Sequence, residues 1–137
     1  LARSDIDPDP GQSFKARGWS NYYLDEFTKA NKDFGEAITF LEKSFKKTKM
    51  NNKKIDIADS FYGRAKAQWE LNKPGETYSD IRSAIEYNPN KPVYRTYLGN
   101  YWIKKGKTRK ACKEFNKAKN LGKPSDKLIK LINKHCG

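Results

Sequence analysis

The sequence predicts an all-α fold in which helix-turn-helix units repeat and stack into a solenoid. Apolar residues recur at spacings of three or four along most of the chain, and no segment alternates like a β-strand. A set of residues also recurs after 34 positions. A period of this length is typical of paired helices that stack, because one pair cannot bury its apolar face alone. The upstream set is Arg64, Ala65, Gln68, Asn72, Thr77, Ile81 and Ala84, and the downstream set is Leu98, Gly99, Trp102, Gly106, Ala111, Phe115 and Ala118.

The N-terminal part is expected to hold a tail followed by two helices. Residues 7–11 contain two prolines and no helical period, so residues 1–17 are expected to be extended or mobile. The helical pattern begins at Gly18, and the polar residues 31–33 are expected to separate the first helix from the second. Residues 51–54 are expected to form a loop or a frayed helix end.

Five further helices are expected after residue 54, each bounded by a recognisable start or stop. Pro74 separates the first two of them, because proline disfavours helix in the preceding residue. Gly106 suits a left-handed C-cap, Thr108 suits an N-cap, and Ser125 suits the N-cap of the last helix. The expected ranges are about 57–71, 75–87, 92–105, 108–122 and 125–135.

The charge of the chain points to anionic partners without selecting one. The net charge is +13 and the isoelectric point is about 9.7. Residues 104–135 carry twelve Lys or Arg against only Glu114 and Asp126. Such a surplus is typical of proteins that bind nucleic acid, an anionic surface or an acidic protein, and also of helix faces that are simply solvated. The chain contains no run of 18 apolar residues, so the sequence predicts no transmembrane helix.

In repeat register the chain resembles the tetratricopeptide repeat (TPR) family. The resemblance implies small residues where the two helices of a repeat approach closely, with rings in the gaps between repeats. In this register Ala37, Thr77 and Ala111 coincide, and Asp25 replaces the small residue of the first repeat. The resemblance therefore implies a repeat domain over residues 18–137. Its repeats are expected at about 18–51, 58–91 and 92–125, followed by a capping helix at about 125–135.

The TPR resemblance also implies a concave groove lined by the first helix of each repeat. Tyr22 and Tyr62 share one position in the expected register and would form an aromatic rail. Lys66 and Asn100 would hold a carboxylate or a backbone amide. The family's clamp for a C-terminal carboxylate needs more Lys, Arg and Asn than this chain offers, so chaperone-tail binding is not expected. The expected groove residues are Tyr22, Glu26, Tyr62, Lys66, Trp69, Thr96, Asn100 and Ile103.

The two cysteines of the chain suggest a covalent link to the capping helix. If the last two helices form an antiparallel hairpin with its turn at 122–125, Cys112 and Cys136 lie side by side. A disulfide there would stabilise the fold by about 3 kcal/mol through loop closure. The alternative is two free, buried thiols that pack as small hydrophobes. A disulfide would indicate an extracytoplasmic compartment, periplasmic or secreted, which the resemblance to exported bacterial TPR proteins also implies; without it a cytoplasmic location is expected.

No arrangement of residues in the sequence predicts catalysis, a cofactor or a metal site. The single histidine, His135, stands beside Cys136 with no third residue to orient it. The segment 106–108 resembles the end of a phosphate-binding loop, but Gly99 stands six residues earlier rather than four. Asp5, Asp7 and Asp9 alternate like calcium ligands but lack the glycine turn and the closing glutamate.

The sequence therefore predicts a non-catalytic module that binds a peptide segment or partner protein in its groove, as part of a larger assembly. The alternative is binding of nucleic acid or an anionic surface through the Lys-rich residues 104–134. Rings that stack on bases would favour nucleic acid. Within that half only Phe115, an expected core residue, and His135 are present, which favours protein binding.

Overall fold

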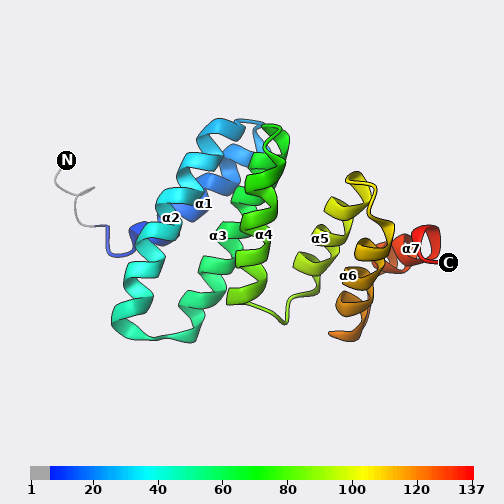
Figure 1. The fold of residues 1–137 in the computed structure, drawn as a ribbon. Helices are drawn as coiled ribbons and strands as arrows, with labels where there is room; N and C mark the ends of the chain where they lie inside the picture. Colours follow the sequence, from blue (N-terminus) through cyan, green and yellow to red (C-terminus); the bar gives the residue numbers. More distant parts are fainter. Residues whose placement is uncertain (1–6) are drawn as a thin grey trace. The chain divides into compact units, whose positions relative to one another are not determined.

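A computed structural model describes residues 7–137, which form seven α-helices and no strand (Figure 1). The prediction of an all-α helical-repeat fold is therefore confirmed. None of the described helices is both long enough and apolar enough to cross a membrane. The helices are α1 (Pro10–Tyr23), α2 (Phe27–Thr48), α3 (Asn51–Glu70), α4 (Pro74–Tyr87), α5 (Pro92–Lys104), α6 (Thr108–Asn120) and α7 (Asp126–His135).

The chain divides into two compact units, the first ending at Tyr87 and the second beginning at Asn88. In the first unit α2 packs on α1, α3 packs on α2, and α4 packs on α3, while α1 also contacts α3. In the second unit α5 packs on α6, and α6 contacts α7. The sequence predicted one repeat domain over residues 18–137 and did not separate these units.

The first helix begins earlier than the sequence predicts. Residues 10–17, expected in the tail, form more than half of α1. The Asp9 side chain accepts a hydrogen bond from the Gln12 N–H at 3.3 Å, and Pro10 occupies the first helical turn, where its fixed φ is tolerated. The prolines that indicated a tail therefore start a helix. Residues 1–6 of the expected tail lie outside the described residues.

The turn of the first repeat lies at residues 24–26, not at the expected 31–33. Each first helix of a repeat ends in a left-handed residue, with φ of 61° at Asp25, 61° at Asn72 and 74° at Gly106. The N–H of the next residue donates to the carbonyl five positions earlier in all three turns, at 2.8 to 2.9 Å. This pattern is the Schellman motif that ends many helices. The three turns are thus equivalent.

These turns correct the register of the first repeat. Asp25 and Asn72 are separated by 47 residues, whereas Asn72 and Gly106 are separated by 34. The first repeat therefore begins near residue 11 rather than 18, and its equivalent of Thr77 is Ala30 instead of Ala37. The number of residues inserted after it is 13 (47 − 34) rather than six.

The inserted residues lengthen α2 and α3. These helices contain 22 and 20 residues, whereas α4, α5 and α6 contain 14, 13 and 13. Residues 51–54, expected as a loop or frayed end, form the first turn of α3. We refer to residues 43–56, the added turns with their connection, as the hairpin extension.

A small residue on the first helix lets the second helix approach closely. In the first repeat a Cβ on Gly18 would lie 2.8 Å from Cε1 of Phe34, and in the third a Cβ on Gly99 would overlap the ring of Phe115. Both rings are fully buried. The close approach implied by the TPR resemblance is therefore present in both units.

Each repeat also carries an ion pair between its two helices, which the sequence analysis missed. The carboxylates of Asp33 and Asp80 are almost fully buried, so their guanidinium partners offset a large desolvation cost. The sequence does carry a signal for these pairs. Acidic residues recur at Asp33, Asp80 and Glu114, with the same spacings of 47 and 34 residues that separate the turns. The pairs are Arg17–Asp33 at 2.8 Å, Arg64–Asp80 at 2.7 Å and Arg95–Glu114 at 3.1 Å.

The capping helix is positioned as the sequence predicts. The Ser125 hydroxyl accepts a hydrogen bond from the Leu128 N–H at 3.1 Å and caps α7. The Leu128 side chain is buried with Ala111, Phe115 and Ala118. Thr108, expected as an N-cap, is instead the first residue of α6, whose cap residue makes no side-chain hydrogen bond.

Replacing Gly99 with alanine should destabilise the second unit by about 1–3 kcal/mol, because the added methyl overlaps the Phe115 ring. The matched control is Gly75→Ala, where a Cβ meets no atom within 4 Å. Alanine at this helical position should be neutral or stabilise by up to about 1 kcal/mol. Urea unfolding followed by circular dichroism measures both changes, and equal stabilities for the two variants would contradict the packing described here.

Candidate functional site

Rings from α1 and α3 meet on one surface of the first unit. The ring centroid of Trp19 lies 5.9 Å from that of Tyr22 and 6.1 Å from that of Tyr62. All three side chains are half-buried, so part of each ring remains in solvent. We refer to this surface as the α1–α3 face, which comprises Lys15, Trp19, Tyr22, Asp59, Tyr62 and Lys66.

Lys66 lies against two of these rings. Its Nζ is 5.1 Å from the ring centroid of Tyr22 and 5.4 Å from that of Tyr62, within the range of cation–π attraction. The structure thus brings three of the expected groove residues, Tyr22, Tyr62 and Lys66, together on one surface. The expectation that Tyr22 and Tyr62 share one repeat position is wrong. In the corrected register Tyr62 is equivalent to Lys15, and Tyr22 is equivalent to Trp69.

Hydrogen bonds fix α1 against α3 beneath the rings. The Trp19 Nε1–H donates to Asp59 Oδ2 at 2.9 Å, and Lys15 Nζ lies 3.1 Å from Asp56 Oδ1 and 3.7 Å from Asp59 Oδ2. The Gln12 amide also donates to Asp56. Lys15 was missed because it falls inside the segment expected to be a tail. These bonds orient the indole, so its ring is held in place before any ligand binds.

Glu26 does not lie on the first helix of its repeat. It is exposed, follows the left-handed residue Asp25, and occupies the N-cap position of α2. The expected assignment of Glu26 to the groove is therefore wrong, and its physical cause is the seven-residue error in register. Trp19 takes the equivalent position on α1.

The other expected groove residues lie on α3 and α5. Trp69 is half-buried near the end of α3. In the second unit Thr96 and Asn100 are half-buried on α5, and the Thr96 hydroxyl donates to the Pro92 carbonyl at 3.0 Å. Ile103 packs against the core cluster around Phe115, so part of its side chain has a structural role.

Burial changes the acid–base chemistry of the tyrosines on the α1–α3 face. Loss of solvent raises the pKa of Tyr62 to about 12, and the neighbouring Tyr22 adds a smaller effect. Burial is also the main cause that raises the pKa of Tyr22, followed by the negative charge of Glu70. Both phenols therefore stay neutral near pH 7 and keep a hydroxyl that can donate and accept hydrogen bonds.

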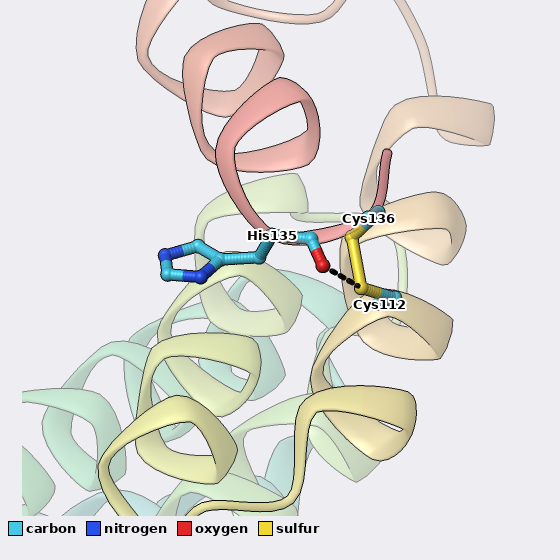
Figure 2. Close-up of a disulfide and its surroundings, with 3 residues drawn as sticks. All are labelled: Cys112, His135 and Cys136. Carbon is cyan, nitrogen blue, oxygen red and sulfur yellow. Dashed lines mark hydrogen bonds between the residues drawn. A yellow bond between two sulfur atoms is a disulfide. The ribbon is translucent and has the colours of Figure 1, made fainter.

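The two cysteines meet at the end of the capping helix (Figure 2). Their Sγ atoms lie 2.09 Å apart, at bonding distance for a disulfide, and link α6 to the residue that follows α7. The Cys112 Sγ is also 3.5 Å from the His135 carbonyl oxygen. Because a disulfide sulfur carries no proton, this is a contact rather than a donated hydrogen bond. The His135 ring points away from both sulfurs (Figure 2).

No site for metal chemistry is evident in the part of the chain that the structure describes. Among residues 7–137, no three side chains of His, Cys, Asp or Glu gather so that they could hold a metal ion. The carboxylates of Asp56 and Asp59 are instead bound by Lys15, Gln12 and Trp19. What this face offers chemically is ring surface and hydrogen bonding.

Comparison with known proteins reveals similarity in structure but not in sequence. No family model and no curated protein matches the chain. The first TPR of Spaghetti (RPAP3), bound to an HSP90 peptide, superposes with a TM-score of 0.73 at 15 % identity, covering 96 % of this chain and 94 % of that one. The chain has a TPR-like helical-repeat fold.

Two bacterial structures give the same fold. The type III secretion chaperone SycD of Yersinia enterocolitica, in complex with a peptide of the translocator YopD, has a TM-score of 0.70 at 10 % identity, covering 91 % of this chain and 86 % of that one. PilF of Pseudomonas aeruginosa has a TM-score of 0.70 at 14 % identity, covering 93 % of this chain and 55 % of PilF. At these identities the likeness establishes the TPR-like fold, and the partners belong to those proteins.

Replacing both cysteines with serine should lower the free energy of unfolding of the second unit by about 3 kcal/mol. Without the cross-link, the unfolded chain has a higher conformational entropy. The cysteines are 24 residues apart, which sets the size of that loop. Urea unfolding of the oxidised, reduced and Ser/Ser proteins measures the effect. Intact mass after alkylation under non-reducing conditions is the control, and two alkylated thiols in oxidised protein would contradict the bond.

Tyr62 should make the stability of the fold depend on pH in alkaline solution. Its pKa rises from about 10 in the unfolded chain to about 12 in the folded protein, so its contribution is complete below pH 10 and is lost as the pH rises through 12. Tyr62→Phe should therefore lose less stability over this interval than the wild type. Thermal unfolding between pH 9 and about 12 tests this. Equal losses of stability in the two proteins over this interval would contradict the prediction.

Proposed function

We propose that this chain is a non-catalytic interaction module that binds a peptide segment or partner protein on the first helices of its repeats, as part of a larger assembly. The TPR-like fold supports this proposal, since two of the similar structures hold bound peptides. The observation that carries it is the α1–α3 face, where Lys66 lies between the rings of Tyr22 and Tyr62.

The chemistry of the α1–α3 face suits the capture of a protein segment. Trp and Tyr bury a large area at a small cost in conformational entropy and dominate many protein interfaces. Tyr23 stacks on Trp19 at 5.9 Å between centroids, and Tyr23 and its neighbour Leu24 are 73 % and 71 % exposed. Apolar surface therefore continues from the α1–α3 face to the end of α1 and is available for burial by a partner.

We place the module in an extracytoplasmic compartment, periplasmic or secreted. The support is the close approach of Cys112 and Cys136, because disulfides persist in oxidising compartments and are rare in the cytosol. A bond that ties α7 to α6 also protects the end of the domain, where helical repeats otherwise fray.

The lysine-rich residues 104–134 favour nucleic acid less than a protein partner. Phe115, the aromatic residue of that half, is fully buried and presents no face on which a base could stack. The positive charge remains, so weak binding of any polyanion through this half is expected to fall steeply with added salt.

The proposal is tested by selecting peptides from a displayed library with the full, oxidised chain as bait. Tyr62→Ala should lower the affinity of a selected peptide at least about tenfold, as expected for a ring at the centre of an interface. Glu26→Gln is the matched control and should leave the affinity unchanged, since Glu26 lies beyond the end of α1. Circular dichroism of both variants separates a loss of binding from a loss of fold.

Two results would overturn this proposed function. Either the oxidised chain selects no peptide, or the selected peptides bind the Tyr62→Ala and wild-type proteins equally. A polyanion that binds tightly, with an affinity that depends steeply on salt and does not change in Tyr62→Ala, would instead establish the nucleic-acid alternative.

A further inference from the structure

The hairpin extension projects beyond the end of α4, the last helix of its unit. Tyr87, the last residue of α4, donates its hydroxyl hydrogen bond to Glu42 at 2.7 Å and stacks on Phe61 at 5.9 Å. The chain between Glu42 and Phe61 therefore extends past the end of α4. Figure 1 shows the connection between α2 and α3 at the opposite end of this unit from the α1–α2 and α3–α4 turns.

The projecting segment is strongly basic. Residues 43–56 contain six lysines and one carboxylate, that of Asp56, which is paired with Lys15. One of them, Lys53, lies 3.5 Å from an Asp9 carboxylate oxygen at the start of α1. The lysines exposed to solvent are Lys43, Lys46, Lys47 and Lys49, and Lys53 and Lys54 are half-buried.

The start of α3 carries charge of the wrong sign for a helix N-terminus. Lys46 and Lys47 stand in the last turn of α2, where the negative pole of the helix dipole favours them. Lys53 and Lys54 stand in the first turns of α3, near its positive pole, and the first turn holds no acidic residue. The ion pair with Asp9 accounts for Lys53, whereas helix stability does not explain Lys54.

Apolar side chains are exposed at the same place. Met50 is 51 % exposed and occupies the N-cap position of α3, where it makes no capping hydrogen bond. Ser, Thr, Asn or Asp at this position would stabilise the helix. Ile55, one turn into α3, is 52 % exposed. Both the charge and the N-cap residue at the start of α3 therefore differ from those that stabilise a helix N-terminus. Such departures are expected where a segment has a binding role.

We propose that the hairpin extension docks on an anionic lipid surface. The exposed lysines at the end of α2 would meet the headgroups, and Met50 and Ile55 would enter the boundary between headgroups and acyl chains. The aliphatic stems of the lysines allow this depth, because they bury while their ammonium groups stay at the interface. The exposed residues of the hairpin extension are not part of the α1–α3 face, which the extension meets through the ion pair of Asp56 with Lys15.

Nucleic acid fits the hairpin extension less well than lipid does. Its one ring, Phe45, is half-buried and packs against the core cluster of Ala37, Leu41 and Ile57. No ring of the extension is therefore available to stack on bases. Exposed aliphatic side chains at a projecting tip instead suit a fluid surface, which accepts them without a matching pocket.

Co-sedimentation of the full, oxidised chain with vesicles tests the proposal. Binding is expected to vesicles of phosphatidylcholine with phosphatidylglycerol and not to phosphatidylcholine alone. Neutralising three exposed lysines in K43Q/K46Q/K47Q should weaken this binding about a hundredfold. The matched control K127Q/K130Q/K134Q changes the net charge equally, but on α7, and should bind nearly as the wild type does.

A second variant tests the apolar contribution. In M50S/I55Q serine provides the missing N-cap, so α3 should be at least as stable as in the wild type. Vesicle binding should nevertheless fall about tenfold, because the inserted apolar area is lost. Thermal unfolding of the same samples shows that the fold is retained.

Three results would overturn the lipid proposal. The wild type could fail to bind anionic vesicles, or the two lysine variants could lose binding equally, which would mean that net charge alone is responsible. The third is that single-stranded DNA, and not the vesicles, binds to the wild type and is lost from K43Q/K46Q/K47Q, which would assign the extension to nucleic acid.

Discussion

The fold depends on the close approach of the two helices within a repeat, where glycine faces an aromatic ring. Gly18 beneath Phe34 and Gly99 beneath Phe115 leave no room for a methyl group. This contact fixes how each first helix lies on its partner. The acidic residue of the interhelical ion pair directly precedes the ring in both repeats, as Asp33 and Glu114. The first helices consequently keep their other side for contacts outside the repeat, and the α1–α3 face lies there.

The second and third repeats were predictable because nothing interrupts their 34-residue period. The first repeat was not, for physical reasons that the sequence conceals. Asp25 adopts a left-handed conformation that glycine usually occupies, so no glycine marks this turn in the sequence. Asp33 resembled part of a loop, although its carboxylate is buried against Arg17. The 13 added residues (47 − 34) then concealed the true spacing.

The candidate site was predictable in its residue types more than in its register. Tyr22, Tyr62 and Lys66 lie together on one surface, whereas Glu26 was placed on the wrong helix by the same error in register. The bonds of Lys15 to the α3 carboxylates join residues more than 40 positions apart, so local spacing gave no signal for them. The proximity of the two cysteines could be predicted from the sequence, because the turn of an antiparallel hairpin determines which residues face each other.

The link between Cys112 and Cys136 also determines how mechanical tension would pass through the second unit. A pull applied at the chain beyond Cys136 enters α6 at Cys112 through the two sulfur atoms. The disulfide closes a covalent loop that contains α7 and its connection to α6. Because the force passes directly through the sulfur atoms, this loop carries little of it. The capping helix would therefore keep Leu128 seated in the core while the domain is under load.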